Sequence, residues 1–477
     1  MFLDDLIKTA PEIVILTFAC LILLLGAFLP KKLQVYTYYI TQLGLVFGVC
    51  SIFLTMTGTK DFAFNALFIR DNLSDLLKII SQITLLFVFL YSKKFLLYMK
   101  ILSGEYFCLG LFGLLGIMIM ISGNNLITLY LGLELLSLSL YTMIAFVRDS
   151  SVASESAMKY FVLGSLASGV LLYGFSLLYG VTHTLEISSI NSYLMSNDMN
   201  QLQLVFSLVF ILSGLAFKLG AVPFHMWLPD VYEGSPTSVT LYISAIPKIA
   251  GVALLLRVLG GALPNMYSDW HFLLIFLAVL SLTFGNIIAI AQNNIKRMLA
   301  YSAISHTGFI LLGVLSGADL GYSSAVFYVI VYSIMVTAVF GIILLLSSKN
   351  SEMDLLRDFQ GLAHNSPWLA FLMLIIMFSM AGIPLTAGFY AKLFVLHALI
   401  DAGLIWLAVY AVIFTVVGAY YYLRVVWYMY FEKPQAPIAM EPSFVVSSAV
   451  SVNTLLLLIL FIFPQTLLGI CVVATNF

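Results

Sequence analysis

The chain has 477 residues, of which 62% are hydrophobic and only 9% are charged, and its mean hydropathy is +1.08. Soluble domains usually carry about 25% charged residues. This composition therefore excludes an ordinary soluble protein and indicates a polytopic, all-α membrane protein. The net charge of −1 says nothing about nucleic acid, but the sequence has no basic patch for phosphate binding, so we expect no nucleic-acid partner.

Apolar runs of about 18 residues or more predict membrane-spanning helices. We expect the first run to remain in the protein as a helix, because the acidic start MFLDD lacks the basic segment of a secretory signal. The fourteen predicted helices cover residues 9–29, 36–56, 74–92, 105–122, 125–146, 157–180, 203–227, 236–257, 271–292, 297–317, 321–347, 367–397, 403–427 and 444–470.

Lys and Arg residues are unevenly distributed between the two sides of these helices. Thirteen lie on the side of the odd-numbered connections and four on the opposite side. Because basic residues favour the cytoplasmic side of a membrane, we predict that both termini lie outside. The seventh connection is an exception, since it carries His225, Asp230 and Glu233 but no basic residue.

The remaining basic residues fall inside predicted helices. Lys78 lies one turn inside the third helix, and we expect its side chain to snorkel to the surface. Lys218, Lys248 and Lys392 lie deeper, and Glu134 in the fifth helix is the one clear intramembrane carboxylate. A lysine at the centre of a spanning helix costs roughly 2.5–3.5 kcal/mol on insertion scales, so these residues are candidates for function.

Two of the predicted helices that carry a deep lysine are expected to be broken. Helix 7 has Lys218 before Pro223, and helix 12 has Pro384 before Lys392. Broken backbone inside a membrane must face protein or a water-filled cavity. The breaks lie five helices apart, which predicts two inverted five-helix repeats, helices 4–8 and 9–13. The predicted divisions of the chain are 1–104, 105–257, 258–427 and 428–477.

Glu134 and Lys218 could act together in two ways. A nearby carboxylate keeps a buried lysine protonated, and separation of the two lets desolvation favour the neutral amine. A pair whose distance changes is therefore a proton switch. The alternative is a static ion pair that holds helices 5 and 7 together.

Lys248 and Lys392 have no acidic neighbour in the sequence. Lys248 suits a proton relay, and the alternative is a lysine bonded to carbonyls freed at the Pro247 kink. Lys392 lies eight residues beyond Pro384, about 12 Å along a helix. It suits an outer-side exit, and the alternative is a snorkelling lysine.

Other polar and aromatic residues allow weaker predictions. His225 and His306 are either proton links or structural histidines. The run Tyr420–Tyr422 is expected to pack helices or to lie at interfaces. The sequence holds no hydrolase signature, metal-ligand cluster, dinucleotide fingerprint or CxxC pair. We therefore expect the chain to move charge rather than to make or break substrate bonds.

Three motifs resemble signatures of the antiporter-like membrane subunits of respiratory complex I, the proton-translocating NADH-quinone oxidoreductase. The resemblance extends across all fourteen helices, and the chain ends without the long lateral helix of one branch of that family. The motifs are Lys218 followed by PFHMWLPDVYEGSP at 223–236, NIKRMLAYSAISH at 294–306, and AGIPLTAGFYAK at 381–392.

The resemblance implies a role for each matching position. Glu134 and Lys218 would form a coupling pair, Lys248 a central relay and Lys392 an outer-side residue. The implied proton-transfer residues are Glu134, Lys218, Lys248 and Lys392, with His225 and His306 as auxiliary links.

The resemblance also implies partners. NADH, FMN, iron–sulfur clusters and quinone would be bound by other subunits, and quinone reduction there would drive transport. The partners would be antiporter-like and small helical membrane subunits, in a bacterial inner membrane. Two rival functions remain: a cation/proton antiporter of the Mrp type, and a scaffold whose buried charges only fix helix packing.

Overall fold

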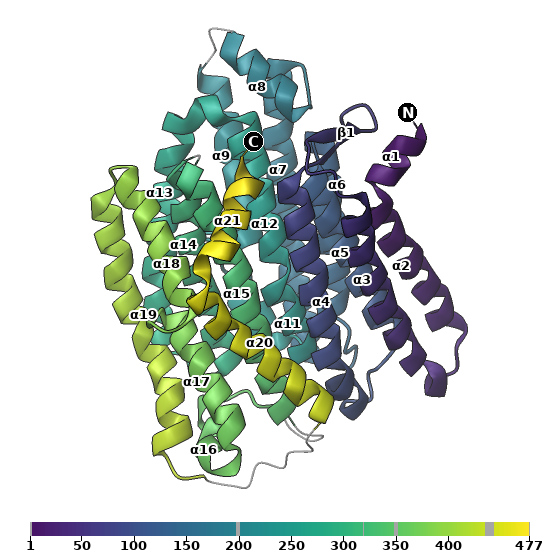
Figure 1. Ribbon diagram of the computed structural model, residues 1–477, viewed down its shortest axis with the longest axis vertical. Helices are drawn as coiled ribbons and strands as arrows, with labels where there is room; N and C mark the ends of the chain where they lie inside the picture. The colour runs from purple at the N-terminus through teal and green to yellow at the C-terminus, as the bar shows by residue number, and fades with distance from the viewer. Residues whose placement is uncertain (1, 197–200, 318, 348–351, 435–442, 477) are drawn as a thin grey trace.

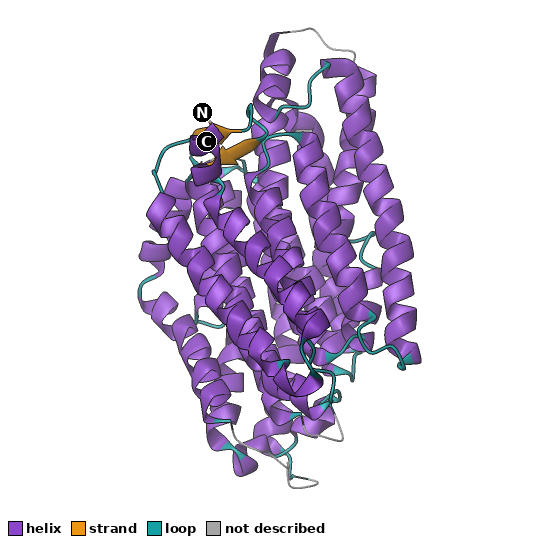
Figure 2. Cartoon of the chain, turned by 90° about the vertical axis from the view of Figure 1, so that its right-hand side faces the viewer, coloured by secondary structure: helices purple, strands orange, loops and turns teal. Residues whose placement is uncertain are grey.

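The computed structural model describes residues 2–196, 201–317, 319–347, 352–434 and 443–476. Helices dominate it, and they run broadly along the long axis of the molecule (Figure 1). Figures 1 and 2 show both termini at the same end of the molecule. The two short strands, β1 (Asp61–Ala63) and β2 (Phe68–Arg70), form an antiparallel hairpin at that end.

The described part of the chain before the second predicted repeat, which begins at residue 258, contains the twelve helices α1 to α12. The two segments α11 and α12 continue as a π-helical turn at Leu256–Ala262. The helices before them are α1 (Phe2–Lys8), α2 (Ala10–Phe28), α3 (Val35–Thr55), α4 (Asn72–Tyr98), α5 (Gly104–Ser122), α6 (Leu126–Ile144), α7 (Ser151–Thr182), α8 (Ile187–Ser196), α9 (Gln201–Leu219) and α10 (Trp227–Gly234), followed by α11 (Thr237–Ala245) and α12 (Pro247–Leu255).

The second half repeats the pattern of long helices and one break. Its helices are α13 (Tyr267–Ile290), α14 (Ile295–Leu315), α15 (Asp319–Leu346), α16 (Leu362–Asn365), α17 (Pro367–Ala381), α18 (Ala387–Asp401), α19 (Ile405–Phe431), α20 (Phe444–Ile462) and α21 (Pro464–Thr475).

Thirteen helices of the described chain are long and apolar enough to cross a membrane. The remaining predicted crossing, 367–397, is divided into α17 and α18, so the broken twelfth helix is confirmed. The break in helix 7 is also confirmed, but α9 ends at Leu219 and not at residue 227. Gly220 takes a left-handed conformation there (φ +71°), which ends the helix before Pro223 can.

The centre of the bundle differs sharply from its edge. Of the residues in their most apolar windows, 94% are buried in Thr237–Ala262, 94% in α14 and 89% in α15, against 28% in α2 and in α20. The central helices therefore contact protein on all sides, whereas the outer ones expose apolar side chains on the surface of the bundle. Lys248, His306 and Tyr332 all belong to this buried centre.

Candidate functional site

Lys218 and Glu134 do not form a direct ion pair. Lys218 lies in the last turn of α9, and its ammonium donates a hydrogen bond to the Ser137 hydroxyl at 2.8 Å. Ser137 follows Glu134 by three residues on α6, so both side chains lie on one side of that helix. One carboxylate oxygen of Glu134 is buried without a hydrogen-bond partner among the described residues. The static ion pair is thus not formed in this structure.

The break beyond α9 faces protein. The backbone N–H of Val222 donates to the Ser281 hydroxyl of α13 at 3.0 Å, and the Thr307 hydroxyl of α14 donates to the Leu219 carbonyl at 3.0 Å. These two side chains satisfy backbone groups that Gly220 frees by ending the helix. The broken segment is consequently fixed against the buried centre of the bundle.

Lys248 is held by α14. Its side chain is 4% exposed, and its ammonium donates to the Thr307 hydroxyl at 2.9 Å and to the Ala303 carbonyl. The ammonium also lies 4.5 Å from the centroid of the Tyr332 ring. These partners differ from the expected carbonyls at the Pro247 kink. Thr307 therefore connects Lys248 to the end of α9.

His306 has a hydroxyl partner on each ring nitrogen. Nδ1 lies 2.7 Å from the Tyr328 hydroxyl, and Nε2 lies 3.1 Å from the Tyr422 hydroxyl. The Tyr422 hydroxyl also hydrogen-bonds to Ser302. The imidazole centroid is 5.1 Å from that of Tyr332, the ring beside the central lysine. His306 is thus part of a buried polar network rather than an isolated core histidine.

The Lys392 side chain points back to the break between α17 and α18. Its ammonium donates to the carbonyls of Met380 and Ala381, at 3.0 and 2.9 Å, which end α17. The expected alternative of a snorkelling lysine is not observed. The ammonium lies 5.2 Å from the centroid of the Phe309 ring, which stacks on Tyr328, a partner of the buried histidine. Rings and hydroxyls therefore bridge the two central lysines.

His225 makes no polar contact with the lysines or with His306. It is half-buried between α9 and α10, its Nδ1 has no hydrogen-bond partner in the described chain, and no polar contact joins it to Lys218. The structure thus brings Lys218, Lys248, His306 and Lys392 into one series and leaves His225 at its edge.

Sequence reasoning missed the neutral residues of the site, which are Ser137, Thr307, Tyr328, Tyr332 and Tyr422. Tyr422 is buried, as expected of a residue that packs helices, but its hydroxyl also contacts His306. Thr307 directly follows the histidine of the second motif, and that position was the only available signal.

Ion pairs explain the acidic seventh connection. Asp230 on α10 accepts hydrogen bonds from Lys159 at 3.0 Å and from Arg297 at 2.9 Å, and Arg297 also donates to Glu233 at 2.7 Å. Burial alone would raise the pKa of Asp230, but Lys159 and Arg297 outweigh burial and lower it. The acidic residues therefore neutralise basic residues of neighbouring connections.

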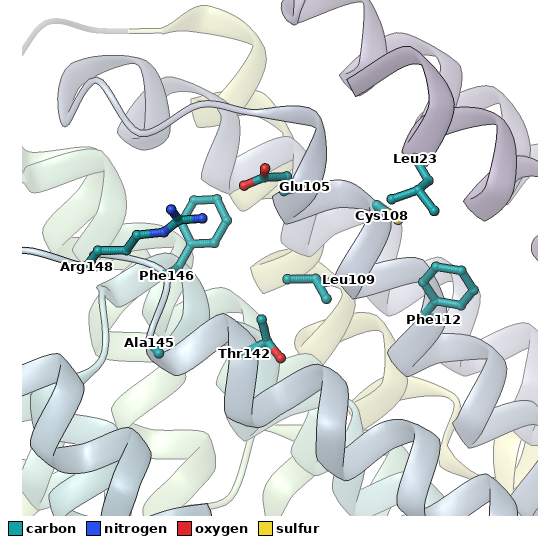
Figure 3. Close-up of a pocket in the computed structure, with 9 residues that line it drawn as sticks. All are labelled: Leu23, Glu105, Cys108, Leu109, Phe112, Thr142, Ala145, Phe146 and Arg148. Atoms are coloured by element: carbon teal, nitrogen blue, oxygen red, sulfur yellow. The ribbon is translucent and has the colours of Figure 1, made fainter. Parts of the chain in front are cut away.

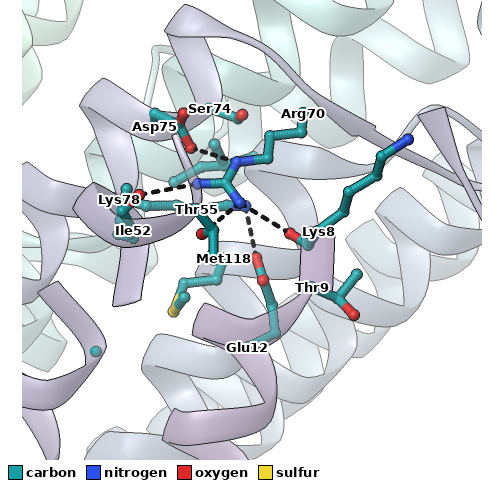
Figure 4. Close-up of polar contacts among 12 residues, drawn as sticks. Lys8, Thr9, Glu12, Ile52, Thr55, Arg70, Ser74, Asp75, Lys78 and Met118 are labelled. Atoms are coloured by element: carbon teal, nitrogen blue, oxygen red, sulfur yellow. Dashed lines mark hydrogen bonds and ion pairs between the residues drawn. The ribbon is translucent and has the colours of Figure 1, made fainter. Parts of the chain in front are cut away.

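Lys78 and Glu12 correct two expectations. Lys78 is fully buried and does not snorkel, because its ammonium lies 2.6 Å from a carboxylate oxygen of Glu12 on α2 and 4.7 Å from the Phe68 ring (Figure 4). Glu12, 8% exposed, is therefore a second intramembrane carboxylate beside the predicted Glu134. The pair lies at the end of the bundle that carries the termini.

Two buried arginines form ion pairs at the same end of the bundle. Arg70, 1% exposed, donates to Asp75 at 3.0 Å (Figure 4). Arg257 holds Asp71, the N-cap of α4, through two hydrogen bonds of 2.6 and 2.8 Å. Burial alone would raise the pKa of Asp71, but Arg257 and Ser74 outweigh it and lower the pKa to about 2.

Comparisons with known proteins place the chain in a family. Residues 123–418 match the family described as NADH:quinone oxidoreductase/Mrp antiporter, TM. The chain is 52% identical to NADH-quinone oxidoreductase subunit N of Thioalkalivibrio sulfidiphilus, over 98% of both chains.

Solved structures agree with this placement. A chain of respiratory complex I from Thermus thermophilus with bound Aureothin is 30% identical, with a TM-score of 0.82 over 96% of this chain and 98% of that one. A chain of the Mrp complex from Dietzia sp. shares only the fold, at 21% identity and a TM-score of 0.85 over 100% of this chain and 97% of that one. The chain therefore belongs to the NADH-quinone oxidoreductase subunit N family of antiporter-like membrane subunits.

Proposed function

We propose that this chain is a proton-translocating membrane subunit of an NADH-quinone oxidoreductase. One observation carries the proposal: the half-buried Lys218 and the buried Lys248 and Lys392 lie in one series, and all three ammonium groups are held by hydroxyls and carbonyls rather than by carboxylates. Such partners let a lysine lose its proton without leaving an uncompensated buried charge.

The proton path starts at Glu134. When a neighbouring subunit changes its charge state, Glu134 moves relative to Lys218, and the proton of Lys218 becomes easier to release. Thr307 contacts both the end of α9 and Lys248, so it is suited to pass that proton inward. His306 and its tyrosine partners lie between Lys248 and Lys392, the outer-side residue of the path.

The energy comes from elsewhere in the assembly. Relatives at about half identity are named subunits of NADH-quinone oxidoreductase. NADH, FMN, iron–sulfur clusters and quinone would be bound by partner subunits, and quinone reduction would drive the charge movement. The chain would contact antiporter-like and small helical subunits in a bacterial inner membrane, with both termini on the periplasmic side.

Internal symmetry would give the path its two halves. We propose inverted repeats at 105–257 and 258–427, flanked by helices 1–3 and helix 14. The breaks support them, since Gly220 and Gly382 both take positive φ, +71° and +82°, where α9 and α17 end.

The test is Lys218→Ala in the intact complex, with Lys60→Ala as a control that removes an exposed lysine without a role in the series. We measure NADH oxidation and acidification of inverted membrane vesicles. The proposal predicts that Lys218→Ala loses most proton uptake and Lys60→Ala keeps it. Full pumping by an assembled Lys218→Ala complex would defeat the proposal.

A second candidate, a stand-alone cation/proton antiporter, is favoured by the likeness to the Mrp fold. The purified subunit in liposomes separates the two. An antiporter exchanges Na⁺ or K⁺ for protons without redox partners, whereas the proposed subunit does not.

A further inference from the structure

A membrane-level cavity lies away from the lysine series. Its volume is about 500 Å³, and its lining residues come from α2, α5, the end of α6 and the connection that follows α6 (Figure 3). The lining residues are Leu23, Glu105, Cys108, Leu109, Phe112, Thr142, Ala145, Phe146 and Arg148. None of the residues that the sequence predicts for proton transfer lines this cavity.

The depth of the cavity matches one leaflet of a bilayer. Glu105 lies in the first turn of α5, and Arg148 lies just beyond the end of α6, so both mark the rim. Phe112 lies eight residues into α5, about 12 Å below its start. Half of a hydrocarbon core is about 15 Å thick, so the cavity runs from headgroup level into the acyl region.

The two rim charges have no partner in the described chain. Glu105 and Arg148 are both exposed, and neither makes a hydrogen bond or an ion pair with protein. Figure 3 shows them towards one end of the cavity, with Leu23 and Phe112 towards the other. Each charge alone is ordinary, since an acid suits a helix N-terminus and an arginine suits the cytoplasmic side. Together they present opposite charges above one apolar cavity.

We propose that this cavity binds a phospholipid with a zwitterionic amine headgroup, of the phosphatidylethanolamine class. The Arg148 guanidinium would hold the phosphate, and the Glu105 carboxylate would accept hydrogen bonds from the primary ammonium. An acyl chain would lie against Leu23, Leu109 and Phe112. Choline cannot donate hydrogen bonds, and glycerol headgroups lack the cation, so both would bind less well.

The experiment uses the purified complex and a phosphatidylethanolamine that carries a photoactivatable group in one acyl chain. Cross-linked peptides are mapped by mass spectrometry, in competition with unlabelled lipids. We expect label on α5 near Leu109 and Phe112, displaced by phosphatidylethanolamine but several-fold less by phosphatidylcholine or phosphatidylglycerol. Arg148→Gln should lose most of the label, and Glu105→Gln should lose the preference for ethanolamine over choline.

Lys32→Gln is the control, because Lys32 is an exposed cation in the connection after α2, at the end of the bundle where α5 begins. It should leave the label unchanged. Equal labelling of wild type and Arg148→Gln overturns the proposal, as does equal competition by phosphatidylglycerol. Label found only on peptides of another subunit, with none on α5, also overturns it. These outcomes do not depend on proton pumping, so they separate this inference from the proposed function.

Discussion

Buried cations in this protein are held in two different ways. In the series at the centre of the bundle, Lys248 and Lys392 are bonded to a threonine hydroxyl and to carbonyls. Towards its two ends, Lys78, Arg257 and Lys296 are bonded to carboxylates at 2.6 to 3.0 Å. Deprotonating a lysine of the first kind leaves no orphaned charge, whereas breaking a pair of the second kind does. The difference separates groups suited to carry protons from groups that fix the fold.

The largest expected effect is a loss of stability when the buried pair of Asp71 and Arg257 is broken. Arg257→Leu leaves the Asp71 carboxylate, with a side chain 14% exposed, without its partner. We expect a loss of roughly 3–5 kcal/mol in the free energy of unfolding, as for other broken buried pairs. Denaturation of the purified protein in detergent measures it. The double variant Asp71→Asn/Arg257→Leu should recover most of the loss; no recovery would mean that the pair is not the cause.

The pair of Asp71 and Arg257 also predicts that the stability of the protein falls at low pH. Asp71 has a folded pKa of about 2, below its unfolded value of about 3.9. Its contribution, about 2.5 kcal/mol, is therefore complete above pH 4 and is lost as the pH falls from about 4 to 2. Denaturation between pH 6 and 2.5 should show wild type losing stability that Asp71→Asn does not lose. Parallel curves for the two proteins would contradict the linkage.

A smaller loss of stability is expected when an uncharged partner of Lys248 is changed. Thr307→Val removes the hydroxyl that contacts Lys248 and the Leu219 carbonyl. We expect a loss of about 1–2 kcal/mol together with slower proton transport, while Thr307→Ser keeps both. The comparison uses NADH-driven proton uptake normalised to the amount of assembled complex. Normal transport by Thr307→Val would remove this residue from the path.

The smallest effect on stability is expected for an exposed ion pair. The Lys159 side chain is 46% exposed, and its partner Asp230 keeps Arg297 when the lysine is removed. Lys159→Ala should therefore leave the thermal unfolding midpoint unresolved from wild type. A clear drop in that midpoint would show that this ion pair belongs with the fixed, buried kind.

The sequence was sufficient for the membrane helices, the presence of both breaks and the deep lysines, because hydropathy and helix-breaking residues act locally. The prolines indicated the two breaks, although Gly220 and Gly382 are the residues that end α9 and α17. It was insufficient where a partner comes from a distant segment. Lys78 lies one turn inside its helix, which favours snorkelling, and only the fold brings Glu12 of α2 beside it. For the same reason, the contact between Tyr422 and His306 could not be predicted, since an aromatic run in α19 is equally compatible with packing.

The most direct test compares two buried lysines that differ in their partners. Lys248 contacts Thr307, whereas Lys296 lies 2.9 and 3.0 Å from carboxylate oxygens of Glu352 and Asp354. The measurement is the number of protons moved per NADH oxidised by complexes with Lys248→Met or Lys296→Met. We predict that Lys248→Met assembles but pumps fewer protons, and that Lys296→Met loses stability but keeps the wild-type ratio in the complexes that assemble. A wild-type ratio in Lys248→Met would contradict the account.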